Sequence, residues 1–538
     1  MSPVSVTLDD KYVLDRGRVY LSGTQALVRL PMMQRERDRA AGLKTGGFIS
    51  GYRGSPLGGY DYALWHARDL LPQHDIHFEP GINEDLAATA VWGSQQVMLS
   101  PDANVDGVFA IWYGKGPGAD RSIDPFKHGN AAGSSRHGGV LLIVGDDHGC
   151  QSSTLPHQSE QDFVSAMIPL LNPATVQEYV DFGLLGFALS RYSGCWVGFK
   201  AIAEAVESWA SITLDPHRLT IVEPADFTLP PGGLNIRWPD TPLEQERRLH
   251  GPKMAAVAAF ARANRFDRLV LDPPQARLGV MATGKAYLDV RQALSELGID
   301  DAQALALGIR LYKVGLAWPL ETEGARRFAD GLEDVLVVEE KRGFVEDQLC
   351  RALYNMEASR RPSVVGKRDE SGAPLLPSEG EIGPTMVARA LLARLQRLGV
   401  DTPAFRQRLA RLESFEKPLD VALPKTQRTP YFCSGCPHNT STRVPEGSRA
   451  LAGIGCHFMA QWIPARHTAT FSHMGGEGAA WIGQAPFTRE KHIFQNIGDG
   501  TYQHSGLLAI RAAAAAGVNI TYKILYNDAV AMTGGQPV

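Results

Sequence analysis

Short apolar runs that end in glycine-rich or acidic loops are the feature that most limits how this chain folds. Three such runs lie near the N-terminus, at residues 46–50, 107–115 and 138–147. They are apolar enough for strands covered on both faces, and a helical pattern follows the first of them. Strands that alternate with helices form parallel sheets, whose carboxyl ends share one edge. We therefore predict an α/β fold in which the loops after these runs converge: 51–59, 114–122 and 145–154.

The composition excludes several classes of protein. The chain has 538 residues, of which 44% are apolar and 21% charged, so it can form several domains with sizeable cores and is neither disordered nor fibrous. Its formal net charge is -4, without a long run of like charge, which excludes the basic surface of a nucleic-acid binder. Neither a signal peptide nor a membrane-spanning pattern is present. We expect a cytoplasmic protein with no nucleic-acid partner and no membrane partner.

Apolar patterns and proline-rich interruptions divide the chain into five predicted segments. They are a first α/β domain (1–224), a linker and helix (225–266), a second α/β domain (267–360), a helical and irregular connection (361–430) and a third α/β domain (431–538). In the second domain we expect single strands over 309–321 and 334–344. The third domain is short for the number of strands that it should hold. We therefore expect the chain to be truncated within it.

The segment 491–528 predicts one βαβ unit with polar residues at both strand ends. It contains a strand, the turn Gly498-Asp499-Gly500, an alanine-rich helix, a second strand and Asn527. A right-handed crossover brings such strands close together, which places Asp499 and Asn527 at one edge of the sheet. Carboxylate and amide oxygens suit Mg²⁺, which fills its other positions with phosphate oxygens, a backbone carbonyl and water. Taken alone, however, Gly-Asp-Gly also occurs as an ordinary turn.

The Gly-Asp-Gly turn is followed by a predicted helix, a predicted strand and then Asn527. This order resembles the motif of thiamine-diphosphate enzymes. That motif usually ends in two asparagines, whereas Asp528 follows here. The resemblance implies that Asp499 and Asn527 bind Mg²⁺. It also implies that Gly498 and Gly500 let the diphosphate approach the backbone.

A second glycine-rich loop, at 473–480, precedes this motif. In thiamine domains such a loop lies under the cofactor, which makes Gly475, Gly476 and Glu477 candidate cofactor-binding residues. The same residues are also compatible with a plain loop that leads into a helix.

Thiamine enzymes also need a carboxylic acid, supplied by another domain, that hydrogen-bonds the aminopyrimidine ring. Glu84 is the candidate, because it lies at the start of an apolar helical pattern and Asn-Glu after a strand resembles the corresponding acid of 2-oxoacid:ferredoxin oxidoreductases. The alternative is that Glu84 is an acid favoured by the helix dipole, as Asp85 also is.

Six motifs spread over nearly the whole chain resemble the indolepyruvate ferredoxin oxidoreductases within that family. They lie at 51–59, 83–96, 145–162, 432–442, 453–458 and, with Gly-Asp-Gly, 527–536. The resemblance is to the large bacterial form, in which a thiamine-binding α part and a γ part are fused. It implies doubly wound, mainly parallel domains of the thiamine-enzyme type. The first would be the pyrimidine-binding domain, the second similar to the transketolase C-terminal domain, and the third an incomplete diphosphate-binding domain.

The resemblance also implies an activity and its partners. The chain would take part in oxidative decarboxylation of an aryl 2-oxoacid to its acyl-coenzyme A, with electrons passed through an iron-sulfur cluster to ferredoxin. A homodimer is expected, with the γ part beyond residue 538. Ser55 stands at a threonine position of related enzymes and would bind the substrate carboxylate, while Arg53 replaces a proline. Lys115 and Arg121 are candidate cations for that carboxylate or for coenzyme A phosphates, or they are solvated loop charges.

The cysteines indicate a metal or cluster site. Cys433, Cys436 and Cys456 lie close in sequence, and three thiolates with one further ligand can hold zinc or a [4Fe–4S] cluster. A redox pair with a separate buried thiol is the alternative, and His438 and His457 make zinc possible. The resemblance favours the cluster. The other three cysteines are expected to be buried structural residues: Cys150, Cys195 and Cys350.

Two other functions remain open from the sequence. A non-oxidative thiamine-dependent 2-oxoacid decarboxylase would need the cofactor and Glu84 but no cluster. A non-catalytic subunit with a zinc site would need neither thiamine nor iron.

Overall fold

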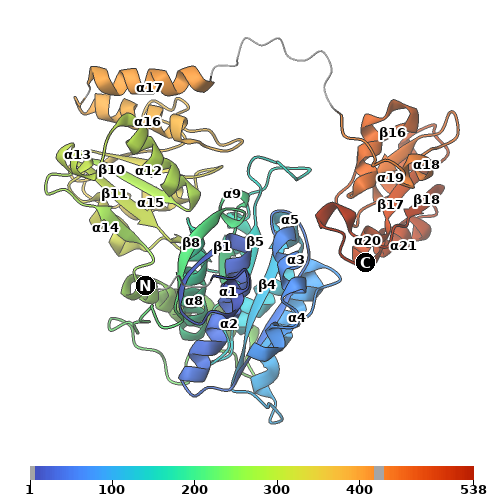
Figure 1. Ribbon diagram of the computed structural model, residues 1–538, viewed down its shortest axis with the longest axis horizontal. Coiled ribbons are helices and arrows are strands. Elements are labelled where there is room, and N and C mark those ends of the chain that lie inside the picture. The colour runs from blue at the N-terminus through green and yellow to red at the C-terminus, as the bar shows by residue number, and fades with distance from the viewer. Residues whose placement is uncertain (1–5, 401, 417–428, 538) are drawn as a thin grey trace. The chain divides into compact units, whose positions relative to one another are not determined.

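The computed structural model describes residues 6–400, 402–416 and 429–537 (Figure 1). The chain forms two compact units, Met1–Pro418 and Leu419–Val538. In the described residues, no helix combines the length and the apolar character that crossing a membrane requires.

A seven-stranded sheet is the centre of the larger unit. Its strands follow the order β12-β6-β7-β5-β4-β2-β3, with the bounds β2 (Thr45–Gly51), β3 (Ile76–Phe78), β4 (Gly107–Lys115), β5 (Val140–Gly145), β6 (Leu170–Leu171), β7 (Val197–Lys200) and β12 (Leu316–Trp318). The neighbours β2, β4 and β5 are parallel. Their carboxyl ends therefore meet at one edge, which confirms that the three predicted loops converge.

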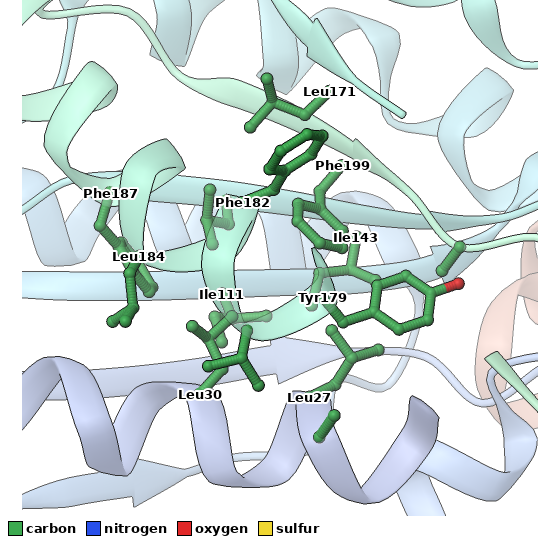
Figure 2. Close-up of a cluster of buried hydrophobic side chains, with 14 of the residues drawn as sticks. Leu27, Leu30, Ile111, Ile143, Leu171, Tyr179, Phe182, Leu184, Phe187 and Phe199 are labelled. Carbon is green, nitrogen blue, oxygen red and sulfur yellow. The ribbon is translucent and has the colours of Figure 1, made fainter. Parts of the chain in front are cut away.

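Both faces of this sheet are buried, as the apolar runs predict. Ile111 and Ile143 point to one face, where α2 (Gly23–Ala40) and α8 (Val176–Ser193) pack (Figure 2). The alternate residue Trp112 points to the other face, against α4 (Glu84–Gln96) and α6 (Ile123–Ala132). The pleat sends successive side chains to opposite faces, so a continuous apolar run is the pattern of a strand covered on both sides.

Smaller elements complete this part of the unit. An antiparallel pair, β1 (Gly17–Ser22) and β8 (Trp209–Leu214), forms a separate sheet. Residues 225–241 form no helix or strand, in agreement with a linker at the start of the predicted segment 225–266. The other α-helices before residue 265 are α1 (Asp10–Val13), α3 (Gly58–His66), α5 (Gly116–Arg121), α7 (Glu160–Ser165), α9 (Ala203–Val206), α10 (Pro242–Arg248) and α11 (Met254–Asn264).

A five-stranded sheet follows, in the order β14-β13-β10-β11-β9. The strands are β9 (Arg268–Leu271), β10 (Leu278–Thr283), β11 (Ile309–Val314), β13 (Asp334–Val338) and β14 (Ser363–Val365). The helices are α12 (Lys285–Leu297), α13 (Asp301–Ala306), α14 (Thr322–Ala329), α15 (Val345–Leu353), α16 (Pro384–Arg397) and α17 (Pro403–Glu416). Figure 1 shows α16 and α17 beside α12, where they share one apolar cluster. Within the predicted segment 361–430, β14, α16 and α17 thus belong to this part of the larger unit.

The prediction of a single strand over 309–321 is wrong. The chain bends at Gly315, so that β11 stays in the five-stranded sheet while β12 pairs with β6 of the seven-stranded sheet. A Cβ at Gly315 would lie 2.3 Å from the Phe266 carbonyl oxygen. The Asp267 carboxylate accepts hydrogen bonds from the backbone N–H groups of Gly315 (2.8 Å) and Leu316 (3.0 Å), which fixes the bend.

The smaller unit contains a four-stranded parallel sheet in the order β16-β15-β17-β18. Its strands are β15 (Ala450–Ala452), β16 (Thr468–Phe471), β17 (Ile493–Gly498) and β18 (Ile520–Leu525). Its helices are α18 (His438–Ser441), α19 (Ala479–Gln484), α20 (Asp499–Thr501) and α21 (Leu507–Ala515). Because α21 connects the adjacent parallel strands β17 and β18, the predicted βαβ unit is confirmed.

Candidate functional site

Glu84 is the first residue of α4 and lies at the carboxyl edge of the seven-stranded sheet. The side chain of Asn83 caps the helix by accepting a hydrogen bond from Leu86 N–H (3.0 Å). The indole N–H of Trp112, on β4, donates to the Glu84 carbonyl oxygen (2.9 Å). The Glu84 side chain is buried. The start of the helix is therefore fixed against the sheet, and a carboxylate is held at its edge.

The short helix α5 packs directly over this carboxylate. The guanidinium Nε of Arg121 lies 4.0 Å from Glu84 Oε2. A Cβ at Gly118 would lie only 2.6 Å from Glu84 Cγ, so α5 approaches this closely because residue 118 is glycine. The structure thus places Arg121, predicted as a substrate or coenzyme A cation, beside the acid.

The other predicted cation, Lys115, lies beside two serines. Its ammonium group donates to the Ser152 carbonyl oxygen (3.1 Å), and the Ser152 hydroxyl donates to Ser55 Oγ (2.7 Å). Burial lowers the pKa of Lys115, while the nearby charge of Asp147 acts in the opposite direction. One residue from each converging loop therefore meets at this point.

Ser152 is a candidate that sequence reasoning missed. Asp147 folds its loop by accepting hydrogen bonds from Gln151 N–H (2.9 Å), Ser152 N–H (2.8 Å) and the Ser153 hydroxyl (2.6 Å). Against the effect of burial, these bonds lower the Asp147 pKa. An aspartate followed at short range by small polar residues is a known turn signal, so the signal for this loop was present in the sequence.

A second residue that the sequence did not reveal is His157, which lies between two aspartates. Its Nε2 is 2.8 Å from Asp120 Oδ2, and its Nδ1 is 3.6 Å from Asp146 Oδ1. Burial alone would lower the His157 pKa, but the two carboxylates raise it to about 10. The ring packs against Gly116, where a Cβ would lie 2.2 Å from Nδ1. His157 therefore ties α5 to the loop after β5.

In the smaller unit, the structure brings Asp499 and Asn527 together as predicted. The Asp499 Oδ2 atom accepts hydrogen bonds from the backbone N–H groups of Asn527 (2.9 Å) and Asp528 (2.7 Å). Its Oδ1 atom accepts from Gly500 N–H (2.9 Å). The carboxylate thus connects the ends of the two adjacent strands.

The donor set around Asp499 fits a magnesium ion. One amide atom of Asn527 lies 3.1 Å from Asp499 Oδ1 and 2.9 Å from the Ala529 carbonyl oxygen. When no metal is bound, hydrogen bonding favours the orientation in which this atom is the amide nitrogen, because the nitrogen can donate to both oxygens. If the amide rotates so that its oxygen takes this position, the Asn527 amide oxygen, Asp499 Oδ1 and the Ala529 carbonyl oxygen converge. Three such oxygens are a ligand set for a hard divalent cation.

Glu477 holds the loop 473–480 against the turn before Cys456. It is fully buried, and its carboxylate accepts from Gly475 N–H (2.7 Å) and Ile454 N–H (3.2 Å). Burial raises the Glu477 pKa to about 7, although these hydrogen bonds act in the opposite direction. Gly476 packs on His473, which a Cβ would approach to 2.6 Å. Glu477 therefore contacts the backbone of its own loop.

Three buried polar side chains near Asp499 have atoms without a hydrogen-bond partner in the described residues. They are His438 (Nδ1), His457 (Nε2) and Asn496 (both amide atoms). The Asp499 charge acts on His438, whose pKa burial lowers. Burial and His438 lower the His457 pKa to about 3. Because unpartnered buried polar atoms are rare, this cluster fits a polar ligand such as a diphosphate.

Cys433 and Cys436, two of the predicted cluster cysteines, act on the third, Cys456. Burial raises the pKa of the Cys456 thiol, and the nearby charges of Cys436 and Cys433 raise it further. Within 6–400, 402–416 and 429–537, no three His, Cys, Asp or Glu side chains are arranged to hold a metal ion. Cys195 is buried, Cys150 is half-buried and Cys350 is exposed. The expectation that Cys350 is buried is therefore wrong, because it lies on the outer side of α15.

The mainly parallel α/β architecture is similar to that of a solved 2-oxoacid oxidoreductase. A solved structure described as "2-oxoglutarate:ferredoxin oxidoreductase from Magnetococcus marinus with 2-oxoglutarate, coenzyme A and succinyl-CoA bound" matches with a TM-score of 0.50 at 16% identity, over 71% of this chain and 65% of that chain. A family profile described as "Thiamine pyrophosphate enzyme, C-terminal TPP binding domain" matches residues 453–538. Another, "Indolepyruvate oxidoreductase domain", matches residues 268–418.

The chain is related to the indolepyruvate oxidoreductase subunits called IorA. It is 28% identical to the one from Pyrococcus horikoshii over 429 residues, which cover 74% of this chain and 61% of that protein. It is 27% identical to the one from Pyrococcus abyssi over 554 residues, which cover 97% and 76%. The predicted resemblance to indolepyruvate oxidoreductases is therefore confirmed. The match to the first relative spans less than two thirds of that protein's length.

Proposed function

We propose that this chain binds thiamine diphosphate and Mg²⁺ and carries out the oxidative decarboxylation of an aryl 2-oxoacid such as indolepyruvate. The observation that carries the proposal is the contact between Asp499 and Asn527, inside the region that matches a thiamine-pyrophosphate-binding domain. The names of the related IorA subunits support the substrate class.

In this proposal the smaller unit holds the metal and the diphosphate. Asp499, Asn527 and the Ala529 carbonyl oxygen supply the Mg²⁺ ligands, since their oxygens converge when the Asn527 amide is reversed. Gly498 and Gly500 would let phosphate oxygens approach the backbone, and Glu477 orders the loop of Gly475 and Gly476 by accepting from Gly475 N–H. The Asp499 carboxylate also accepts hydrogen bonds from three backbone N–H groups, which hold the ends of β17 and β18 together at the proposed metal site.

Glu84 is the proposed acid for the aminopyrimidine ring. Bound thiamine diphosphate would supply the carbon nucleophile and the electron sink that decarboxylation requires. Glu84 would hydrogen-bond the ring and hold a proton there, which its buried position at the start of α4 supports. Arg121, 4.0 Å from Glu84, would keep this carboxylate oriented.

Ser55, Ser152 and Lys115 form the proposed carboxylate site for the 2-oxoacid. Two hydroxyl groups and an ammonium group from three loops match the charge and hydrogen-bonding capacity of a carboxylate. Coenzyme A is the proposed acyl acceptor, as the bound molecules named for the Magnetococcus marinus enzyme suggest.

We also propose that Cys433, Cys436 and Cys456 supply three ligands of a [4Fe–4S] cluster, with ferredoxin as the electron acceptor. Support comes from the effect of Cys433 and Cys436 on the Cys456 thiol and from the name of the matching ferredoxin oxidoreductase. A homodimer, a γ part and a cytoplasmic location belong to the same proposal.

An anaerobic assay of the purified chain tests this function. We expect coenzyme A-dependent reduction of ferredoxin or a viologen dye with indolepyruvate, and less with aliphatic 2-oxoacids. Release of the aldehyde without dye reduction would indicate a non-oxidative decarboxylase instead. One zinc per chain, with neither iron nor thiamine bound, would indicate the non-catalytic subunit.

A further inference from the structure

Two buried histidines lie beside the Gly-Asp-Gly turn and have no assigned role. The His457 side chain is only 1% exposed, and its Nε2 has no hydrogen-bond partner within the described residues. Its ring lies between two glycine turns: a Cβ at Gly455 would be 3.2 Å from its Cε1 atom, and a Cβ at Gly498 would be 3.7 Å from that same atom. Any larger residue at Gly455 would therefore crowd the imidazole.

His438 is the second of these residues. It is 4% exposed, its Nδ1 lacks a partner in the part of the chain that the structure describes, and it packs edge-on against Phe432 with ring centroids 5.6 Å apart. The Asp499 charge acts on His438, and His438 acts on His457. The two imidazoles and the Asp499 carboxylate therefore occupy one buried region of the smaller unit.

A buried ring nitrogen without a partner is unfavourable, because it has lost its hydrogen bond to water without gaining another. A neutral imidazole carries one N–H donor and one acceptor nitrogen. A ligand rich in acceptor oxygens, placed at Asp499, would accept from these N–H groups. Phosphate oxygens on Mg²⁺ have this chemistry, and the open backbone at Gly498 gives them access.

We propose that His457, with His438 beside it, donates hydrogen bonds to the diphosphate of the bound cofactor. This inference rests on the proposed function, since it needs thiamine diphosphate at Asp499. His438 and His457 lie close in sequence to Cys436 and Cys456, and on composition they could be zinc ligands. The proposal assigns them to the diphosphate instead.

Isothermal titration of the full chain with thiamine diphosphate at saturating Mg²⁺ tests the assignment. We expect His457→Ala to weaken binding by about tenfold or more, as the loss of a hydrogen bond to a charged group does. His438→Ala should weaken it in the same direction. His492→Ala is the matched control, because His492 is only half-buried and its Nε2 already pairs with Thr521 Oγ1 (2.8 Å). The affinity of this variant should equal that of the wild type.

A conservative variant and metal analysis keep the test independent of folding. His457→Gln retains an N–H donor and should bind more tightly than His457→Ala, with unchanged thermal unfolding and iron content. Wild-type affinity in both His457 variants would overturn the assignment while leaving the proposed function intact. Bound zinc that His457→Ala removes would also overturn it. If the wild type bound no thiamine diphosphate at all, the proposed function itself would fail.

Discussion

The Asp499 carboxylate accepts a hydrogen bond from the backbone N–H of Asn527 at 2.9 Å, across two adjacent parallel strands. Asp499 therefore has two roles in our account: it fixes the strand ends and it provides a metal ligand. Replacing it by alanine would remove three hydrogen bonds from backbone N–H groups as well as the ligand. Asn527 contributes to the first role through its backbone, so its side chain is the cleaner target.

Glu84→Gln should retain cofactor binding and lose turnover. Glutamine keeps the shape and a hydrogen bond but cannot exchange the proton, and loss of such an acid costs about 10²–10⁴-fold in rate. Steady-state assays together with titration calorimetry measure both quantities. Near-normal turnover would show that Glu84 acts as a helix-start acid only.

Gly118→Ala should lower turnover by displacing Glu84, because the new Cβ would lie 2.6 Å from Glu84 Cγ. Gly93→Ala is the matched control: Gly93 lies in the same helix as Glu84, and a Cβ there meets no atom within 4 Å. That control should retain activity and gain about 0.5–1 kcal/mol of stability. Equal activities of the two variants would contradict the close packing of α5 on Glu84.

His157→Gln should destabilise the protein in a pH-dependent way. The aspartates around His157 raise its pKa to about 10 in the folded chain, against about 6.5 when unfolded. Its stabilising contribution is therefore complete below pH 6.5 and is lost as the pH rises through 10. We expect the gap in Tm between wild type and His157→Gln to be wide at pH 6 and narrow at pH 9.5.

The exposed His128 provides the control for this experiment. His128→Gln should leave Tm close to the wild-type value at both pH values, because its side chain is 63% exposed and its contact with Asp124 is a surface one. A Tm gap for His157→Gln that is constant with pH would contradict an imidazolium held by Asp120 and Asp146.

Cys456→Ser should reduce iron binding. A [4Fe–4S] cluster holds about four iron atoms on cysteine thiolates, so anaerobically reconstituted wild type should bind iron and show the broad visible absorption of a cluster, and the variant should lose most of both. Cys350→Ser, at an exposed cysteine of the larger unit, should leave them unchanged. Zinc in place of iron in the wild type would contradict the cluster.

Apolar patterns and the handedness of crossover connections were enough to predict much of the fold. The runs at β2, β4 and β5 are apolar on both faces of the pleat, so parallel strands and converging loops follow from pattern alone. Asp499 and Asn527 could be paired because crossover handedness restricts where the second strand lies. The first inference depends on the pattern within single strands, and the second on a strand, a helix and a strand that follow one another along the chain.

Contacts between distant segments could not be predicted in this way. The single strand expected over 309–321 divides at Gly315 because Asp267 and Phe266, far upstream, fix the bend. Likewise, the ion pair of His157 with Asp120 depends on tertiary contacts between two separate loops, so the sequence pattern did not indicate it. Lys115 and Arg121 looked equivalent in one loop, but tertiary packing places one at Ser152 and the other at Glu84.

The central claim, a Mg²⁺-dependent thiamine-diphosphate site at Asp499 and Asn527, is tested most directly by titration calorimetry of the wild type and Asn527→Ala. Asn519→Ala is the control, because that side chain donates to the Lys491 carbonyl oxygen (2.9 Å) at the opposite end of the strands. We predict binding by the wild type and Asn519→Ala that disappears when Mg²⁺ is chelated, and at least about tenfold weaker binding by Asn527→Ala. Equal, Mg²⁺-independent affinities in all three proteins, or no binding by the wild type, would contradict the account.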